Sequence, residues 1–137
     1  MNLFDSEYFQ KFIFSKKQLK QYFDNAFKDF EIAECNDNPN VIYRFCYDAV
    51  IKLGIAIIAT KNYKVRSIRG HHIKILETIE KILNLEAEIN YFDRIRRQRN
   101  IDLYEGGIDF TETDAKNLLE ITGKIFNKAK KLFFSNK

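Results

Sequence analysis

The segment from Val41 to about Thr60 is apolar on nearly every side, and it constrains the fold more than any other part of the chain. Its apolar residues recur at the spacing that lines one face of an α-helix. They include Phe45, Cys46, Ala49, Val50, Leu53 and Ile57. A helix that is apolar all round has to be covered by other helices. The segment therefore predicts the most buried helix of a helical bundle.

The rest of the chain also has helical spacing, and no segment shows the alternation that is typical of a strand. Asn38 and Pro39 mark the start of the buried helix, as its cap and first-turn residue. Further helices are expected at 15–33, where Ser15 and Gln18 form a capping-box pattern, at 71–83, at 85–105, and after Thr111, with a shorter one at 6–14 and a loop at 61–70. The sequence predicts an all-α fold, an up-and-down bundle of four main helices plus short extra helices.

The composition is typical of one intracellular domain. Of the 137 residues, 45% are hydrophobic, which is enough to form the core of a single domain. We expect that domain to comprise residues 1–137. A net charge of +4 favours an anionic partner. Cys35 and Cys46 match neither a disulfide framework nor a CxxC metal pattern, which predicts a reducing, cytoplasmic setting. The longest apolar run, 49–59, is interrupted by Lys52 and is too short to cross a bilayer, so no membrane partner is expected.

A cluster of arginines stands where an apolar stripe should continue. Four arginines fall within six residues: Arg94, Arg96, Arg97 and Arg99. The stripe runs through Ile89 and Phe92, and its spacing predicts further apolar residues near 96, near 99 or 100, and near 103, of which only Leu103 is apolar. Arg96, Arg99 and Asn100 occupy the other positions with groups that are costly to bury without a partner. A helix that interrupts its own core face usually does so for a ligand, a partner or a reaction.

The residue types in this cluster suit a phosphodiester or a nucleotide. Arg96, Arg99 and Asn100 lie within about one helical turn, and Tyr104 shares a face with Asn100. A guanidinium offers planar donors that match phosphate, and a tyrosine can stack on a base. The alternative is that the arginines are neutralised by ion pairs. Acidic residues near enough to do so are Asp93, Asp102, Glu86 and Glu88.

The stretch RRQRNIDLYEGG, followed by a capped amphipathic helix, resembles the HEPN superfamily (higher eukaryotes and prokaryotes nucleotide-binding domains). GHHIKILETI also resembles a segment of some prokaryotic members. The resemblance covers roughly residues 20 to 134 in helix order, and its specific part is Arg99–Asn100. In that family, an arginine often followed by a polar residue precedes a histidine by four to six positions. The pair cleaves RNA without a metal, usually in a cleft between two copies of the domain.

The resemblance implies that Arg99, Asn100 and Tyr104 are the catalytic positions, with Tyr104 where the family has its histidine. An unperturbed tyrosine, with a pKa of about 10, is a poor base near neutral pH, so weak or absent nuclease activity is implied. The implied function is a homodimeric domain directed at RNA or nucleotide phosphate, of toxin–antitoxin or defence type. The alternative is a non-catalytic dimerisation or protein-interaction module that partners a nucleotidyltransferase.

The remaining candidates are two adjacent histidines and a basic loop. His71 and His72 point about 100° apart on a helix and lack an HxxxH or cysteine partner, so neither a metal site nor a cofactor is expected. They either add polarity at a helix start, or one of them reaches the arginine groove and replaces the missing histidine. The loop arginines either contact nucleic-acid backbone or are simply solvated. The predicted nucleic-acid-binding set is Arg96, Arg97, Arg66, Arg69 and His72.

Overall fold

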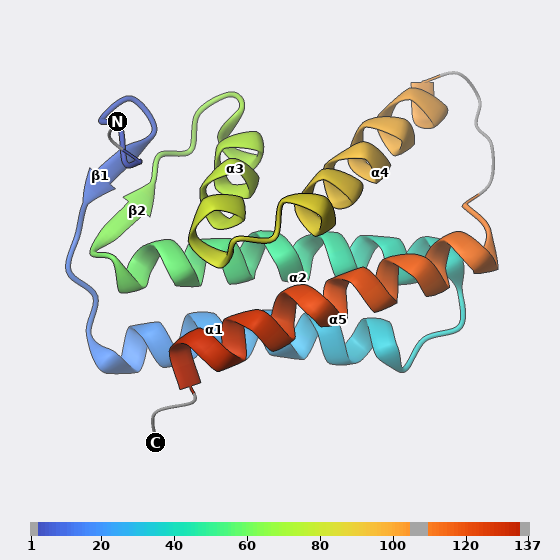
Figure 1. Ribbon diagram of the computed structural model, residues 1–137, viewed down its shortest axis with the longest axis horizontal. Helices are drawn as coiled ribbons and strands as arrows, with labels where there is room; N and C mark the ends of the chain where they lie inside the picture. Colours follow the sequence, from blue (N-terminus) through green and yellow to red (C-terminus); the bar gives the residue numbers. More distant parts are fainter. Residues whose placement is uncertain (1–2, 105–109, 135–137) are drawn as a thin grey trace.

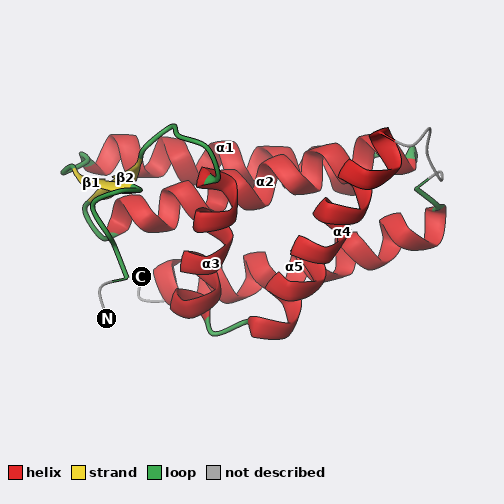
Figure 2. Ribbon diagram, turned by 90° about the horizontal axis from the view of Figure 1, so that it is seen from above, coloured by secondary structure: helices red, strands yellow, loops and turns green. Residues whose placement is uncertain are grey.

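The computed structural model describes residues 3–104 and 110–134, with the side chains of all of these except 99–104 and 134. In chain order the elements are β1 (Phe9–Lys11), α1 (Lys16–Glu34), α2 (Pro39–Thr60), β2 (Tyr63–Val65), α3 (His71–Leu83), α4 (Glu86–Tyr104) and α5 (Glu112–Phe134). α1 and α2 lie antiparallel along the long axis, and α5 runs beside them (Figure 1). Figure 2 shows α3 and α4 lying over α2 and α5. The predicted helical class is confirmed. A regular four-helix bundle is not confirmed, because α3 and α4 are inclined to α1, α2 and α5.

The helix starts follow from capping residues that the sequence shows. At α1, the Ser15 hydroxyl accepts a hydrogen bond from the Gln18 backbone N–H at 3.1 Å, and the Gln18 side-chain oxygen accepts one from the Ser15 N–H at 2.8 Å. At α2, the Asn38 side chain caps the helix and Pro39 opens it. These bonds satisfy backbone donors that a helix start leaves open. The predicted capping box and the predicted start of the buried helix are both confirmed.

The small sheet is the part of the fold that the sequence analysis got wrong. β1 pairs antiparallel with β2, with Phe9 opposite Val65, where a short helix and a structureless loop were predicted. Phe9 is 2% exposed, and the ring of Phe4 stacks on Tyr63 with centroids 4.4 Å apart. These aromatic contacts join segments far apart in the chain. Local spacing cannot reveal them, because such packing overrides intrinsic propensity.

The core centres on α2. Of the helices whose side chains are all described (α1, α2 and α3), α2 has the most buried residues, as predicted. Gly54 allows α3 to approach this helix closely. A Cβ added at Gly54 would overlap Cγ2 of Ile75 and lie 3.3 Å from Cγ2 of Ile79. Glycine is therefore required where the two helices cross. This close crossing places the first turn of α3, with its two histidines, against α2.

Candidate functional site

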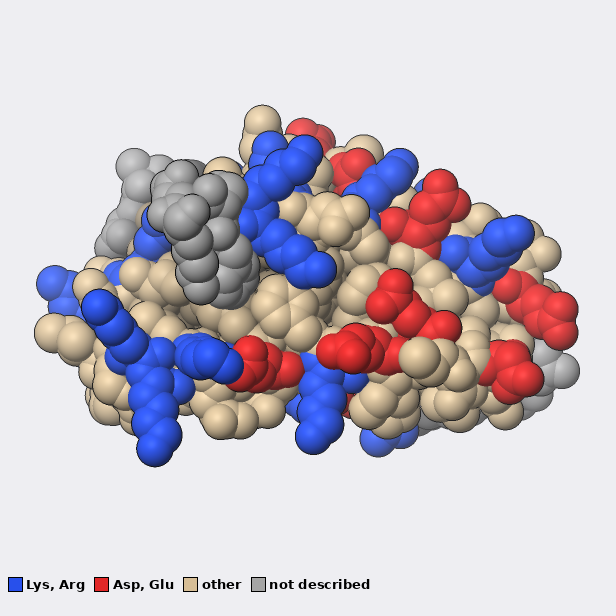
Figure 3. Space-filling view, turned by 90° about the horizontal axis from the view of Figure 1, so that it is seen from below, with Lys and Arg blue, Asp and Glu red and all other residues tan. Residues whose placement is uncertain are grey.

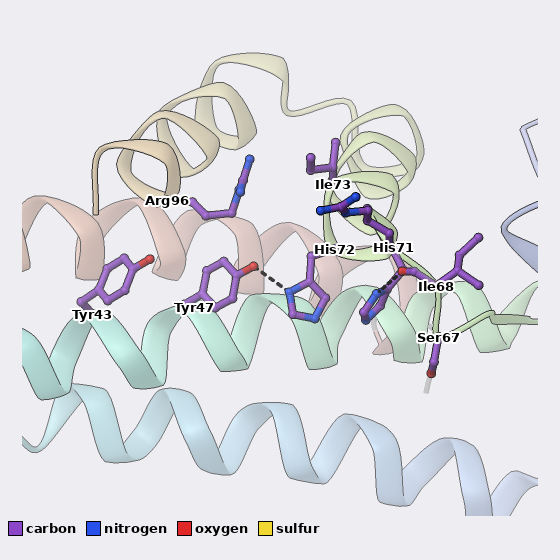
Figure 4. Close-up of a pocket in the computed structure, with 10 residues that line it drawn as sticks. Tyr43, Tyr47, Ser67, Ile68, His71, His72, Ile73 and Arg96 are labelled. Atoms are coloured by element: carbon purple, nitrogen blue, oxygen red, sulfur yellow. Dashed lines mark hydrogen bonds between the residues drawn. The ribbon is translucent and has the colours of Figure 1, made fainter. Parts of the chain in front are cut away.

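A cleft of about 730 Å³ opens where α2, the start of α3 and α4 meet, and it holds both histidines of the chain (Figure 4). α2 contributes Tyr43 and Tyr47, and α4 contributes Arg96. The β2–α3 loop and the first turn of α3 supply the remaining lining residues: Ser67, Ile68, Arg69, Gly70, His71, His72 and Ile73. A volume of this size is typical of small-molecule and cofactor sites. Its lining mixes guanidinium, imidazole and phenol groups, which suits an anionic ligand with a flat ring.

Aromatic rings form a row along one side of the cleft. The ring centroids of Tyr43 and Tyr47 lie 6.1 Å apart, those of Tyr47 and His72 lie 5.7 Å apart, and those of His72 and His71 lie 4.3 Å apart. Beneath the row, Tyr47 stacks nearly parallel on the buried Phe92, with centroids 5.8 Å apart. The core therefore holds the middle of the row in place. A row of this kind offers successive faces to flat groups.

His71 is held in one tautomer by the loop that precedes it. Its Nδ1 lies 2.7 Å from the carbonyl oxygen of Ile68. A carbonyl oxygen only accepts hydrogen bonds, so Nδ1 of His71 carries the proton and donates. In the neutral ring, Nε2 is then the nitrogen with a free lone pair. His71 can accept a hydrogen bond from a ligand hydroxyl at that atom.

His72 is held from the opposite side, by Tyr47. The Tyr47 hydroxyl and Nδ1 of His72 are 2.8 Å apart. Burial raises the pKa of Tyr47 to about 12, so its hydroxyl keeps its proton. Burial, with the nearby His71 and Arg96, lowers the pKa of His72 and keeps its ring neutral at pH 7. We assign the Tyr47 hydroxyl as the donor, which leaves the proton of His72 on Nε2 and gives the cleft a donor beside the acceptor on His71.

Arg96 reaches the cleft from α4 and is anchored by an acidic neighbour. Its Nε lies 3.0 Å and its Nη2 2.9 Å from Oδ1 of Asp93, and its side chain is 15% exposed. Oδ2 of Asp93 also pairs with Nε of Arg97 at 3.2 Å. Both arginines therefore make an ion pair of the kind that the alternative predicts. A guanidinium has five N–H donors, so the bonds to Asp93 leave Arg96 with donors for a ligand.

The structure brings part of the predicted set together. Arg69, His72 and Arg96 line one cleft. Arg97 instead borders a hollow between α4 and α5. Nε of Arg66 donates to the carbonyl oxygen of Ser6 at 3.0 Å and so ties the chain start to the loop. The three predicted catalytic residues lie on the last turns of α4, and their side chains are outside the described part of the structure: Arg99, Asn100 and Tyr104.

The sequence analysis missed Tyr43 and Tyr47 and gave His71 less weight than His72. The two tyrosines are four residues apart on α2, which places them on one face. They are two tyrosines on one face of a largely apolar helix, and this spacing was the signal that the sequence offered. His71 and His72 line the same cleft as Arg96. Whether either histidine reaches Arg99 stays a prediction, because the Arg99 side chain lies outside the described residues.

The described residues show no ready metal site and no membrane span. Within 3–104 and 110–134, no group of three or more His, Cys, Asp or Glu side chains is placed to hold a metal ion. Within the same ranges, no helix has the length and apolar character needed to cross a bilayer. Comparison with protein-family models, with curated proteins and with solved structures finds no match to this chain. The site therefore has to be interpreted from its own geometry.

The pKa of His72 predicts a pH dependence of stability. Because folding lowers this pKa from 6.5, the unfolded chain binds more protons than the folded one below about pH 6.5. The contribution of the neutral His72 ring to the unfolding free energy is fully present above pH 6.5 and is lost as the pH falls. Between pH 7 and pH 5 we expect the unfolding free energy of His72→Gln to fall less than that of the wild type. The difference between the two slopes should be less than about 1.4 kcal/mol per pH unit, because the ring is only partly buried. Urea unfolding of both proteins across this range tests it, and equal slopes would contradict it.

Proposed function

We propose that this chain is a HEPN-like domain that binds RNA or nucleotide phosphate in the cleft between α2, α3 and α4. The observation that carries the proposal is the convergence of Arg69, Arg96, His71 and His72 on one cleft beside a row of aromatic rings. Guanidinium groups form charge-assisted hydrogen bonds with phosphate oxygens. His72 adds a neutral N–H donor next to them. Such a lining is much better suited to a phosphate group than to an apolar ligand.

The ring row supports a nucleic-acid ligand over free phosphate. Bases stack on aromatic side chains, and proteins that bind single strands combine such rings with a basic groove. The rings of Tyr43 and Tyr47 are nearly parallel, at 20°, and stand one helical turn apart. An extended strand can place a base against this pair and a phosphate near His71 and Arg69. Nε2 of His71 can accept a hydrogen bond from a ribose 2′-hydroxyl, a group that DNA lacks.

The proposal includes a homodimer built on the α4 face that runs from Arg96 to Tyr104. Two copies of an arginine-rich face repel each other unless acidic groups neutralise them. Asp93 supplies such a group, because it pairs with both Arg96 and Arg97. The proposed biological role is of toxin–antitoxin or defence type. Nuclease activity is proposed to be weak or absent, because Tyr104 stands where the family has a histidine.

The second candidate is a non-catalytic interaction module that partners a nucleotidyltransferase. The observation that favours it is the apolar rim of the cleft. Ile68 and Ile73 border the cleft and are 39% and 44% exposed. Exposed isoleucines of this kind can bury against a protein. In that case the cleft would bind protein side chains, and RNA would bind no better than to other basic surfaces.

Asp93→Asn tests the proposal through a gain of binding. The substitution keeps the shape of the side chain and removes the negative charge that competes with phosphate for Arg96. We expect a short single-stranded RNA to bind several-fold more tightly, measured by fluorescence anisotropy at fixed salt. Asp24→Asn is the matched control, because Asp24 is an exposed acid that pairs with Lys20 on α1. Equal or weaker binding by Asp93→Asn would count against phosphate in this cleft.

A further inference from the structure

Apolar side chains form a tip at the end of the molecule that holds the small β1–β2 sheet. Residues 12–15 link β1 to α1 at that end, close to β2 and the end of α2 (Figure 1). Ile13 is 82% exposed there, the highest value among the large hydrophobic side chains that the structure describes, and its neighbour Phe12 is 39% exposed. A large apolar side chain this exposed, next to a second one, marks a contact surface better than a scattered surface residue does.

The tip is held in shape by its neighbours. The rings of Phe12 and Phe14 have centroids 4.6 Å apart, and Phe14 meets Tyr22 of α1 at 5.4 Å. The Lys64 ammonium stands over the Phe12 ring, 4.9 Å from its centroid. Ile13 projects from this supported base. The segment therefore presents Ile13 to solvent from a packed base, where a flat or yielding surface can cover it.

The two chain segments that form this end carry basic side chains and no acidic ones. Residues 8–23 contain no Asp or Glu, and neither do residues 49–76. These two segments meet at this end. Exposed lysines around the tip are Lys11, Lys16, Lys17, Lys61 and Lys64. Figure 3 shows Lys and Arg side chains at the left end of the molecule and most acidic side chains further to the right.

A hollow lies directly beside the tip. It measures about 450 Å³, and it is lined by Lys11, Phe12, Ile13, Lys61, Asn62 and Tyr63. Two lysines, Lys11 and Lys61, thus line the same hollow as Ile13. A lipid presents the same pairing, with an anionic headgroup directly above its acyl chains. The hollow is of a size that can hold a phosphate-bearing headgroup.

We propose that this end of the molecule docks on an anionic bilayer surface, with Ile13 and Phe12 inserted among the headgroups and the surrounding lysines against lipid phosphates. Basic residues are drawn to anionic leaflets, and apolar side chains beside them anchor a protein at the interface. The phosphate backbone of a nucleic acid can pair with the lysines but leaves Ile13 in water. A bilayer can pair with the lysines through its lipid phosphates and can also cover Ile13. Peripheral contact of this kind requires no helix that spans the membrane.

Vesicle co-sedimentation of the full chain tests the proposal. We expect binding to vesicles of phosphatidylcholine that contain about 30% phosphatidylserine, an anionic lipid. We expect little binding to vesicles of phosphatidylcholine alone. Ile13→Asp is expected to weaken the binding roughly tenfold or more, because it removes buried apolar area and adds a negative charge. Ile32→Asp is the matched control, since Ile32 is 37% exposed in the last turns of α1, far from the tip. Equal losses in the two variants would overturn the proposal.

A fluorescence measurement separates insertion from simple charge attraction. The chain contains no tryptophan, so Ile13→Trp introduces a single reporter. We expect its emission to shift to the blue on addition of the anionic vesicles, while that of Ile32→Trp stays unchanged. Vesicle binding without a shift at position 13 would mean that only the lysines attract the surface, and would overturn insertion. A third outcome would assign this end to nucleic acid instead. In that case the protein fails to bind vesicles, binds RNA tightly, and loses the RNA binding in Lys11→Glu and Lys16→Glu.

Discussion

Replacing Arg69 and Arg96 together with glutamine should weaken the binding of a short single-stranded RNA by about a hundredfold or more. Both guanidiniums border the cleft, and each can form a charge-assisted hydrogen bond with phosphate. Such a bond contributes roughly 1.5–3 kcal/mol, and each 1.4 kcal/mol corresponds to about a factor of ten in affinity. Fluorescence anisotropy at one salt concentration measures the loss. Glutamine keeps a polar side chain, so the cleft stays hydrated.

The control for this pair removes equal charge elsewhere. Arg44 lies on α2 with a side chain 78% exposed, and Lys116 is exposed near the start of α5. Neither residue lines the cleft. Arg44→Gln with Lys116→Gln should reduce RNA binding only by the modest amount that follows from the lower net charge. If the two double variants lose the same affinity, RNA binds through overall charge and the cleft has no special role.

Phe92→Ala should lower the unfolding free energy by about 3–5 kcal/mol, as is typical when a buried phenylalanine is truncated. Phe92 is 2% exposed and lies beneath the Tyr47 ring, so truncation leaves a cavity directly under the cleft. We expect RNA affinity to fall as well, because Tyr47 loses the ring that positions it. Urea unfolding gives the first quantity, and anisotropy at a temperature where the variant stays folded gives the second.

Ile125→Ala provides the comparison for that double effect. Ile125 is fully buried in α5 and does not line the cleft. Its truncation should destabilise the fold by about 2–5 kcal/mol and leave RNA affinity nearly unchanged while the protein remains folded. If Phe92→Ala also leaves affinity unchanged, the ring row does not contribute to binding.

The helices could be predicted because their signals are local. The cap at Ser15, the Asn38–Pro39 start and the apolar spacing of α2 each lie within one short stretch of chain. The pairing of β1 with β2 could not be predicted, since it depends on a contact between Phe9 and Tyr63, which lie far apart in the chain. Propensity gives no information about such contacts.

The cleft shows the same division. The arginine cluster was visible because it interrupts an apolar stripe, and Arg96 does line the cleft. The partnership of Tyr47 with His72 joins residues 25 positions apart and arises from the crossing of α2 and α3. That crossing depends on Gly54, a single small residue whose role appears only when Ile75 is seen against it. Arg96, on the α4 side of the cleft, could therefore be predicted from the sequence. The contact between Tyr47 and His72, on the α2 and α3 side, could not.

The central claim, that phosphate binds in this cleft, can be tested by NMR of the two histidines. The chain contains no others, and both line the cleft, so a long-range ¹H–¹⁵N spectrum of the imidazoles reports on this site alone. In the free protein we expect His71 as the Nδ1–H tautomer, because that atom donates to the Ile68 carbonyl. On titration with a single-stranded RNA trinucleotide, the Nε2 signals of both rings should shift and saturate together with the anisotropy curve. Saturable RNA binding that leaves both imidazoles unchanged would contradict the claim.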